Sequence, residues 1–255
     1  CPTVRRTPAI DALLSEDLLG QARDFAARTS EAMLDRALSW AYLSETEGSF
    51  AIEGEAPSQT KASAFAQLLQ HVDEPRKLSE DVLVDLQNAA ITNPLDKAFQ
   101  YRSEQNRLQR GSGAAGVTYV PPAPDLVEEL MASLLDVANA PPRDLDPLVH
   151  AAVVSFGFVF IHPFMDGNGR TARVLAALVM HRGGYTRPEF TSLEEWWGAH
   201  RGAYAQAFSC LGEKFADKTD VTSFVVAHVG SQRQQVDARH AGRAHPAGPG
   251  HRLCR

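Results

Sequence analysis

The stretch from His162 to Arg173 reads His-Pro-Phe-Met-Asp-Gly-Asn-Gly-Arg-Thr-Ala-Arg. It brings together an imidazole, a carboxylate, an amide, two glycines and two guanidinium groups. A hydrophobic core has no use for so many polar groups, because ionised side chains are seldom fully buried unless they are paired. The stretch therefore indicates a binding or catalytic loop, and its flanks decide the fold.

A helix is predicted immediately before this loop. Asp146 suits an N-cap, Pro147 suits the first turn, and apolar residues recur at helical spacing as far as residue 160. Pro163 disfavours helical geometry at His162, so we expect the helix to end there.

A second helix is predicted from Asn168 or Gly169 to the glycine pair 183–184. Glycines allow backbone N–H groups to approach an anion closely, and the positive end of a helix dipole attracts one. Arg170 and Arg173 lie three residues apart on the first turn, where their guanidinium groups can bind phosphate oxygens. Because basic residues are unfavourable at a bare helix N-terminus, the pattern predicts a phosphate site.

Each of these features also has an ordinary structural explanation. Asp-Gly-Asn-Gly is a common turn sequence, and a histidine beside phenylalanine is often only packed at the surface. A structural turn does not, however, require a histidine before it and two arginines in helical register after it. The combination favours a functional site.

Residues 162–173 resemble the signature of Fic-domain proteins, H-P-F-x-D/E-G-N-G-R-x-x-R, with all nine fixed letters present. The resemblance implies an all-α, Fic-type helical bundle with a small β-hairpin flap. It also implies transfer of AMP from ATP to a Ser, Thr or Tyr hydroxyl of a target protein, with release of pyrophosphate.

The resemblance assigns roles by position. His162 would take the proton from the target hydroxyl, and Asp166 would hold Mg²⁺ or Mn²⁺ on the phosphates. In the family, a tyrosine pair follows downstream and its first member lies near the adenosine; here the pair reads Tyr204-Ala205. The implied ATP-binding residues are Gly167, Asn168, Gly169, Arg170, Thr171, Ala172, Arg173 and Tyr204.

A second resemblance concerns residues 47–55, Glu-Gly-Ser-Phe-Ala-Ile-Glu-Gly-Glu. By spacing alone, Ser49 and Glu53 share one face of a short helix that Gly54 would close, which is an ordinary helix end. The run is similar to the inhibitory motif S/T-x-x-x-E-G/N of one class of Fic proteins. That similarity implies that Glu53 pairs with Arg173, occupies the place of the γ-phosphate and keeps the enzyme inhibited.

Composition sets wider limits. The 255 residues are 44% hydrophobic and carry a formal net charge of -6, as expected of a soluble globular protein and not of one that mainly binds nucleic acid. No apolar run approaches the roughly 18 residues of a membrane span, and no signal-like leader is seen. The chain opens at Cys1 rather than Met, as a fragment would. Three distant cysteines, Cys1, Cys210 and Cys254, predict neither a disulfide framework nor a zinc site, which favours the cytoplasm.

We predict an N-terminal helical domain with the inhibitory motif at 1–78, a catalytic core at 79–225, a C-terminal helix at 226–240 and a disordered tail at 241–255. Helical patterns cover 10–19, 25–43, 77–109, 124–137, 191–208 and 220–236. Residues 117–120 form a short β-prone run, which in the family would be the flap that clamps the target protein by strand addition.

The expected partners are therefore ATP, a target protein beside 117–120, and possible further copies of the chain through homodimerisation or self-modification. Two alternatives stay open: a Fic fold with other chemistry, such as de-AMPylation or another phosphate-group transfer, and a non-catalytic module that senses ATP. The Gly169-Arg170 pair, in place of the Lys-Arg of the kinase branch, favours AMP transfer.

Overall fold

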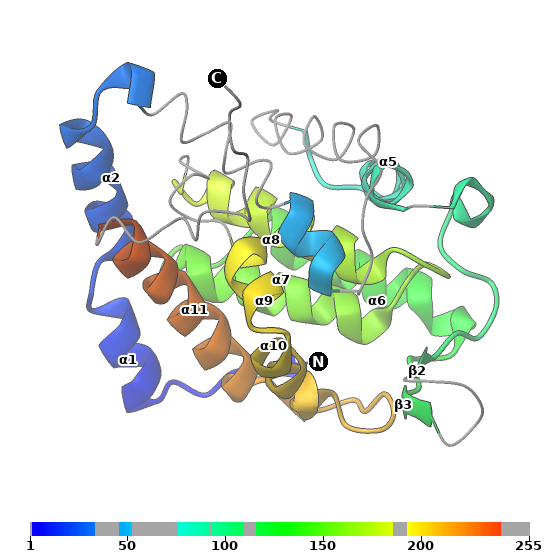
Figure 1. The fold of residues 1–255 in the computed structure, drawn as a ribbon. Helices are drawn as coiled ribbons and strands as arrows, with labels where there is room; N and C mark the ends of the chain where they lie inside the picture. The colour runs from blue at the N-terminus through cyan, green and yellow to red at the C-terminus, as the bar shows by residue number, and fades with distance from the viewer. Residues whose placement is uncertain are drawn as a thin grey trace, which may run out of the picture.

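Helices α7 (Pro147–Ile161) and α8 (Asn168–Arg182) form the centre of the molecule (Figure 1). The computed structural model describes residues 2–33, 46–52, 76–91, 93–109, 116–185 and 193–240. Nearly every side chain of α7 is buried, because its sequence is apolar all round rather than along one stripe. Such a helix needs neighbours on every side, so the rest of the fold is arranged around it.

The predicted helix ends flanking the polar loop are confirmed. The Asp146 carboxylate accepts a hydrogen bond from the Leu148 amide at 2.8 Å and so caps α7. Helix α8 begins at Asn168 and is capped at its other end by Gly183. Short loop 162–167 therefore joins two long helices, and its position is fixed at both ends.

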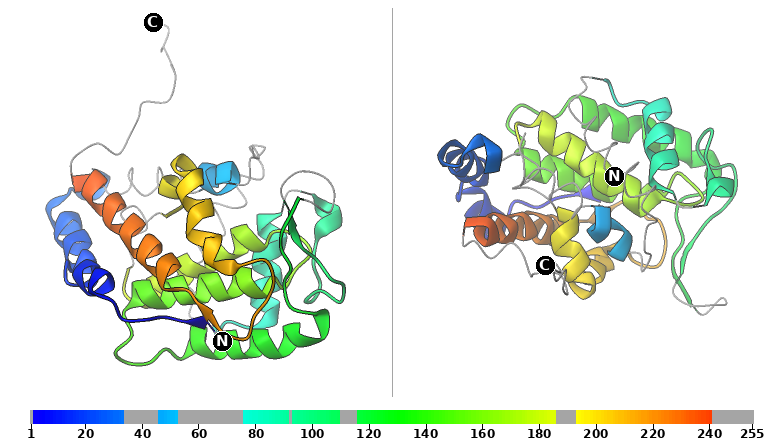
Figure 2. Two further views of the ribbon diagram at one scale, coloured as in Figure 1. Left: turned by 90° about the horizontal axis from the view of Figure 1, so that it is seen from below. Right: turned by 45° about the horizontal axis from the view of Figure 1, so that its top comes forward.

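The surrounding helices cover α7 and α8 from several sides (Figure 2). Helix α5 packs on α8, α6 and α11 pack on α7, and α1 and α2 pack on α11. Their bounds are α1 Pro8–Leu14, α2 Leu18–Arg28, α5 Glu80–Ala90, α6 Val127–Asn139 after the 3-10 turn η4 Pro124–Leu126, α9 Leu193–Ala199, α10 Arg201–Ala207, η6 Phe208–Leu211 and α11 Thr222–His240. The all-α architecture expected from the sequence is confirmed for the described residues.

Two small sheets complete the fold. Strands β2 (Leu108–Gln109) and β3 (Val117–Tyr119) pair antiparallel and form the expected hairpin. The Tyr119 hydroxyl donates to the Phe160 carbonyl at 2.6 Å, which holds β3 against the end of α7 that leads into His162. Strand β1 (Pro2–Thr3) pairs parallel with β4 (Thr219–Asp220), a contact that no local sequence pattern predicts.

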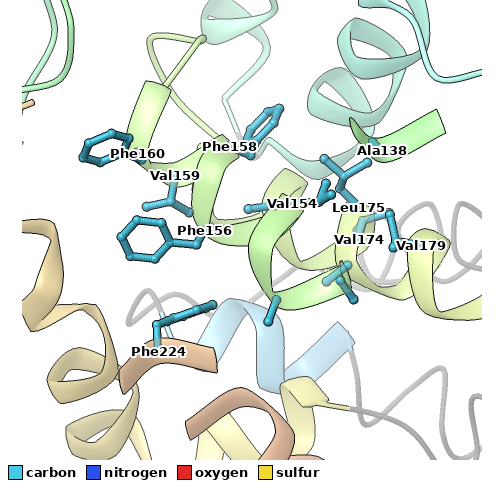
Figure 3. Packing of buried hydrophobic residues seen from close by; sticks show 14 of the residues in the cluster. Ala138, Val154, Phe156, Phe158, Val159, Phe160, Val174, Leu175, Val179 and Phe224 are labelled. Carbon is cyan, nitrogen blue, oxygen red and sulfur yellow. The ribbon is translucent and has the colours of Figure 1, made fainter. Parts of the chain in front are cut away.

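Aromatic side chains of α7 fill the core on both of its faces (Figure 3). The Phe156 ring lies 5.2 Å from that of Phe224 on α11, and the Phe160 ring stacks on Tyr119 at 5.9 Å. Phe158, also fully buried, meets the ring of Phe164 in the polar loop at 6.1 Å. The hydrophobic core therefore supports the loop directly.

The single helix predicted over 77–109 is wrong beyond Ala90. Helix α5 ends there, and Pro94 begins the 3-10 turn η2 (Pro94–Asp96). The chain then folds back on α5, where the Gln87 amide donates to the Asp96 carbonyl and the Asn88 amide oxygen accepts from the Ala98 amide. Polar side chains on α5 thus capture a segment whose composition alone suggested more helix.

Other helical patterns are interrupted or extended. The pattern 10–19 is broken where Asp17 takes a left-handed conformation and caps α2. The pattern 191–208 divides at His200, and the predicted boundary at 225/226 falls inside α11. Helix α2 ends at Arg28, so 25–43 is not one helix from its start; residues 34–43, the tail 241–255 and the loop 111–115 lie outside the described residues.

No helix in the described part of the chain is both long enough and apolar enough to cross a membrane.

Candidate active site

His162 ends α7 in a left-handed conformation, with φ 54° and ψ 60°. Its backbone amide still donates to the Phe158 carbonyl at 2.9 Å, so the turn is part of the helix end. A residue with a Cβ rarely adopts this conformation, and such strain persists only where the surroundings enforce it. The backbone at His162 therefore turns out of the helix at a fixed angle.

Buried Arg102 enforces this turn. Its Nε donates to the His162 carbonyl at 2.8 Å, its backbone amide donates to the Pro163 carbonyl at 2.8 Å, and its Nη2 donates to the Pro122 carbonyl at 2.6 Å. One guanidinium group thus joins the histidine loop to the segment that follows the hairpin. Burial lowers the pKa of Arg102. A guanidinium group nevertheless keeps its proton in a protein, so Arg102 stays charged.

Asn168 closes the loop on itself. Its side-chain oxygen accepts from the Phe164 amide at 2.9 Å, and its side-chain nitrogen donates to the Phe164 carbonyl at 2.7 Å. Asn106 reaches the same carbonyl from outside at 2.7 Å. Because the Asn168 side chain is engaged in this way, only its backbone amide is available for the predicted anion site.

Gly167 is the N-cap of α8, with φ 78°. A Cβ at this position would lie 2.8 Å from Cγ2 of Ile91, so both backbone conformation and space require glycine. The first helical hydrogen bond runs from the Thr171 amide to the Gly167 carbonyl at 2.9 Å. The amides of residues 168–170 precede it, in the position where helix N-termini bind anions.

The His162 imidazole is held as a neutral base. Its Nδ1 lies 3.2 Å from the Val159 carbonyl, and since a carbonyl can only accept, Nδ1 carries the proton and Nε2 keeps its lone pair. Burial lowers the pKa of His162 to about 4, with the neighbouring Arg102 charge acting in the same direction. At neutral pH the ring can therefore accept a proton at Nε2.

A short helix formed by residues 46–52, here called the covering helix, lies over the two arginines of α8 (Figure 1, light blue). The Arg170 guanidinium is 1% exposed and lies 5.1 Å from the centre of the Phe50 ring. Arg173 donates from Nη2 to both the carbonyl and the hydroxyl oxygen of Ser49 at 2.9 Å, and from Nε to that hydroxyl at 3.2 Å. Both predicted phosphate ligands are thus in contact with the covering helix.

Arg173 also has partners outside the covering helix. Its Nη1 donates to the Tyr204 hydroxyl at 3.3 Å, and its Nε lies 3.8 Å from a carboxylate oxygen of Glu194 on α9. The predicted neighbours Thr171 and Ala172 are completely buried, so their side chains offer no surface to a ligand. Tyr204 is brought to the site as predicted, although a contact with adenosine stays a prediction.

The covering helix is closely packed against α9. A Cβ on Gly198 would fall 2.8 Å from Cα of Gly48, so the two backbones approach each other through a pair of glycines. Arg201 also donates from Nη1 to the Ala51 carbonyl at 3.2 Å. Ser49 of the predicted inhibitory motif therefore lies at the site, whereas Glu53 lies outside the described residues.

Sequence reasoning missed several residues that build the site, namely Gln87, Arg102, Asn106, Phe50 and Glu194. Gln87, for example, donates to the Asp166 carbonyl at 3.1 Å and so fixes the half-buried residue predicted to hold the metal. A single polar side chain far away in sequence carries no periodic or motif signal. Only its place in the fold shows what it contacts.

Fold and site together define a helical protein in which a short loop joins a neutral histidine at the end of one central helix to the glycine-capped N-terminus of the next. Residues 77–180 match the model of the Fic/DOC family, so the chain contains a Fic domain. The chain is 29% identical over 215 residues to the protein adenylyltransferase Fic of Nematostella vectensis, an alignment that covers 71% of this chain and 48% of that protein. It thus spans about half the length of this curated relative.

Solved structures share the fold. A Fic family protein from Desulfovibrio desulfuricans G20 matches with a TM-score of 0.74 at 22% identity, over 97% of this chain and 78% of that one. IbpAFic2 covalently tethered to Cdc42 matches with a TM-score of 0.50 at 16% identity, over 82% of this chain and 71% of that one. At these identities the likeness establishes the fold alone.

Proposed function

We propose that this protein is an adenylyltransferase that transfers AMP from ATP to a hydroxyl of a target protein, and that the covering helix holds it inactive. The observation that carries the proposal is the His162 imidazole, neutral and fixed through Nδ1, at the start of the short loop that leads into the N-terminus of α8. The name of the Nematostella relative supports the same chemistry.

In the proposed reaction the target hydroxyl oxygen attacks the α-phosphorus of ATP. The bond from that phosphorus to the bridging oxygen of the β-phosphate breaks, and pyrophosphate leaves. The hydroxyl proton passes to Nε2 of His162, since Nδ1 is occupied by the Val159 carbonyl. General base catalysis of this kind typically contributes ~10²–10⁴-fold. The amides of residues 168–170 would neutralise charge on the phosphates.

Asp166 is the residue that would hold a divalent metal. The described residues contain no cluster of three or more His, Cys, Asp or Glu side chains arranged for a metal. A single half-buried carboxylate beside an anion site fits Mg²⁺, which commonly uses one or two carboxylates together with substrate phosphates. When bound, the metal would stabilise charge on the phosphate oxygens.

Inhibition follows from the two arginines. Arg170 and Arg173 would take the β- and γ-phosphates, but Phe50 and Ser49 are in contact with them here. We propose that Glu53, four residues after Ser49 in the sequence, adds a carboxylate to this arrangement and excludes the γ-phosphate. A hydrogen bond to a charged group contributes ~1.5–3 kcal/mol, which corresponds to a change in activity of roughly ten- to a hundredfold.

The hairpin β2–β3 would receive the target. It lies at the His162 end of α7 through Tyr119, and strand addition to residues 117–119 would hold an extended segment of another chain, since Val120 already pairs with Lys214. The solved Fic structure tethered to Cdc42 supports a protein as the acceptor. Main-chain pairing favours an extended segment without selecting its sequence.

The test is incubation of purified protein with labelled ATP and Mg²⁺, with the adduct identified by mass spectrometry. We expect Glu53→Gly to increase AMP incorporation, into the protein itself or into lysate proteins, by about ten- to a hundredfold. Glu55→Gly, a neighbouring substitution outside the motif, is the matched control and should leave incorporation low. A phosphate adduct would favour kinase-like chemistry, and no adduct in any variant would favour an ATP-sensing module.

Removal of AMP is the remaining alternative. Protein that already carries AMP would be incubated without ATP. Loss of the adduct faster in the wild type than in Glu53→Gly would favour de-AMPylation over transfer.

A further inference from the structure

The Glu194 carboxylate is buried close to Arg173. Its side chain is 3% exposed, and that of Arg173 is 6% exposed. Glu194 lies on α9 and lines a small cavity together with Ser155, Arg173, Tyr204 and His228. A charged group in such surroundings is expensive to keep unless it serves a partner, because burial removes its hydration.

The Glu194 Oε1 atom lies close to Nε of Arg173 but does not form a hydrogen bond with it. The Glu194 Oε1 atom lies 3.8 Å from Nε of Arg173, which is too far for a hydrogen bond, and it has no hydrogen-bond partner among the described residues. Nε of Arg173 donates instead to the Ser49 hydroxyl at 3.2 Å. Ser49 and Glu194 are therefore alternative acceptors for the same N–H group of Arg173.

The two acceptors differ in what holds them. Ser49 belongs to the covering helix, which must leave for the proposed reaction to proceed. Glu194 belongs to α9, which packs against α11 and continues after His200 into α10. When the covering helix leaves, Nε of Arg173 loses the Ser49 hydroxyl, and the Glu194 oxygen is the buried acceptor closest at hand.

We propose that Glu194 is a positioning residue that takes over Nε of Arg173 when the covering helix leaves. The inference rests on the proposed function, since it concerns the released state of the same site. A bond from Nε to Glu194 would hold the guanidinium through Nε, while Tyr204 supports Nη1. The guanidinium then keeps its orientation and presents its outer N–H groups to the γ-phosphate.

A purely structural ion pair would behave differently. If Glu194 only stabilised the fold, its loss would weaken every ligand alike or lower the melting temperature. If Glu194 positions Arg173, its loss weakens the binding of ATP, which carries the γ-phosphate. The binding of AMP, which lacks that phosphate, is unchanged. The ratio of ATP affinity to AMP affinity therefore separates the two roles.

The experiment uses the full chain with Glu53→Gly and Ser49→Ala, which remove the proposed inhibitory carboxylate and the hydroxyl that accepts from Nε of Arg173. Glu194→Met has a similar volume without an acceptor, and Glu194→Ser is too short to reach Nε; either should lower ATP affinity by about tenfold and leave AMP affinity within about twofold. The KM for ATP should rise by the same factor with little change in kcat. Glu194→Gln keeps an acceptor oxygen and should restore most of the ATP affinity.

Ser155→Ala, which changes another polar residue lining the same cavity, is the control and should leave the ATP to AMP ratio unchanged. The proposal is overturned if both Glu194 variants leave the ratio unchanged, or if Glu194→Gln binds ATP as weakly as Glu194→Met. Calorimetry needs no catalysis, so it decides the point even if Glu53→Gly transfers no AMP. In that event the proposed function fails and the role of Glu194 is judged by binding alone.

Discussion

The loop 162–167 and the covering helix meet at the same two arginines but are held in very different ways. The loop is fixed at both ends by long helices and internally by Arg102, Asn106 and Asn168, all buried. The covering helix is described only over residues 46–52, and the contacts described there are with side chains of α8 and α10 and a glycine of α9.

This difference indicates which of the two segments can be displaced at low cost in free energy. Removing a loop contact leaves a buried carbonyl without a donor, which costs free energy that nothing nearby can return. Displacing the covering helix exposes Ser49 and Phe50 but makes the arginines available to phosphate, whose oxygens replace the lost acceptors. On the proposed function, the loop is a permanent part of the site and the covering helix is a removable one.

The largest effect should come from the imidazole itself. We expect His162→Asn to lower AMP transfer by ~10²–10⁴-fold in the Glu53→Gly background, because asparagine cannot serve as the base. Asparagine tolerates the left-handed backbone of residue 162, so the melting temperature should stay close to that of the parent. Transfer retained at the parental rate in a folded His162→Asn protein would contradict the proposed mechanism.

The next effect tests the permanence of the loop. Arg102→Met should destabilise the protein by about 2–4 kcal/mol, because the His162 and Pro122 carbonyls lose their donor in a buried place. Denaturant unfolding measures this directly. Arg107→Met removes an exposed arginine five residues along the chain and is the matched control, expected within about 0.5 kcal/mol of wild type. Equal stability of the two variants would show that the loop does not depend on Arg102.

A smaller effect tests the removable part. Gly198→Ala places a methyl group 2.8 Å from the Gly48 backbone, which cannot yield as a flexible side chain would, so the covering helix must shift. We expect basal AMP transfer to rise several-fold, measured with labelled ATP, while the catalytic loop is untouched.

Gly202→Ala is the matched control, since a Cβ there meets nothing within 4 Å and alanine likewise favours the helix. Basal transfer should be unchanged in this variant. A Gly198→Ala protein as silent as Gly202→Ala would mean that the glycine pair does not set the position of the covering helix.

The smallest expected effect is the loss of folding stability at acidic pH. Burial lowers the pKa of both His162 and His228 to about 4. In the unfolded chain a histidine has a pKa near 6.5. As the pH falls from 6.5 towards 4, the unfolded state therefore binds protons that the native state does not bind, and the free energy of unfolding decreases. Between pH 7.5 and 6 the loss should be about 1 kcal/mol per histidine, followed by denaturant unfolding.

His228→Asn should reduce this pH dependence by about half. The interpretation fails if wild type and variant lose stability equally over the same interval.

The sequence was most informative where chemistry is local. Asp146 and Pro147 predicted the start of α7, and Gly183 predicted the end of α8. Gly167 and Gly169 predicted the turn between the two helices. It failed beyond Ala90, where helical composition continued but Pro94 and the side chains of Gln87 and Asn88 redirected the chain. Local propensity is a weak preference, and tertiary hydrogen bonds outweighed it there.

What the sequence determined by itself is the set of groups that could bind phosphate and move a proton, because these lie within one short loop and one helical turn. The tertiary structure decided how these groups are held. Arg102 donates to the His162 carbonyl, Glu194 lies close to Arg173, and Ser49 and Phe50 contact the two arginines. These partners come from distant parts of the chain. Burial gives their polar contacts a strength that exposed residues lack, and burial is a property of the packed fold rather than of any segment.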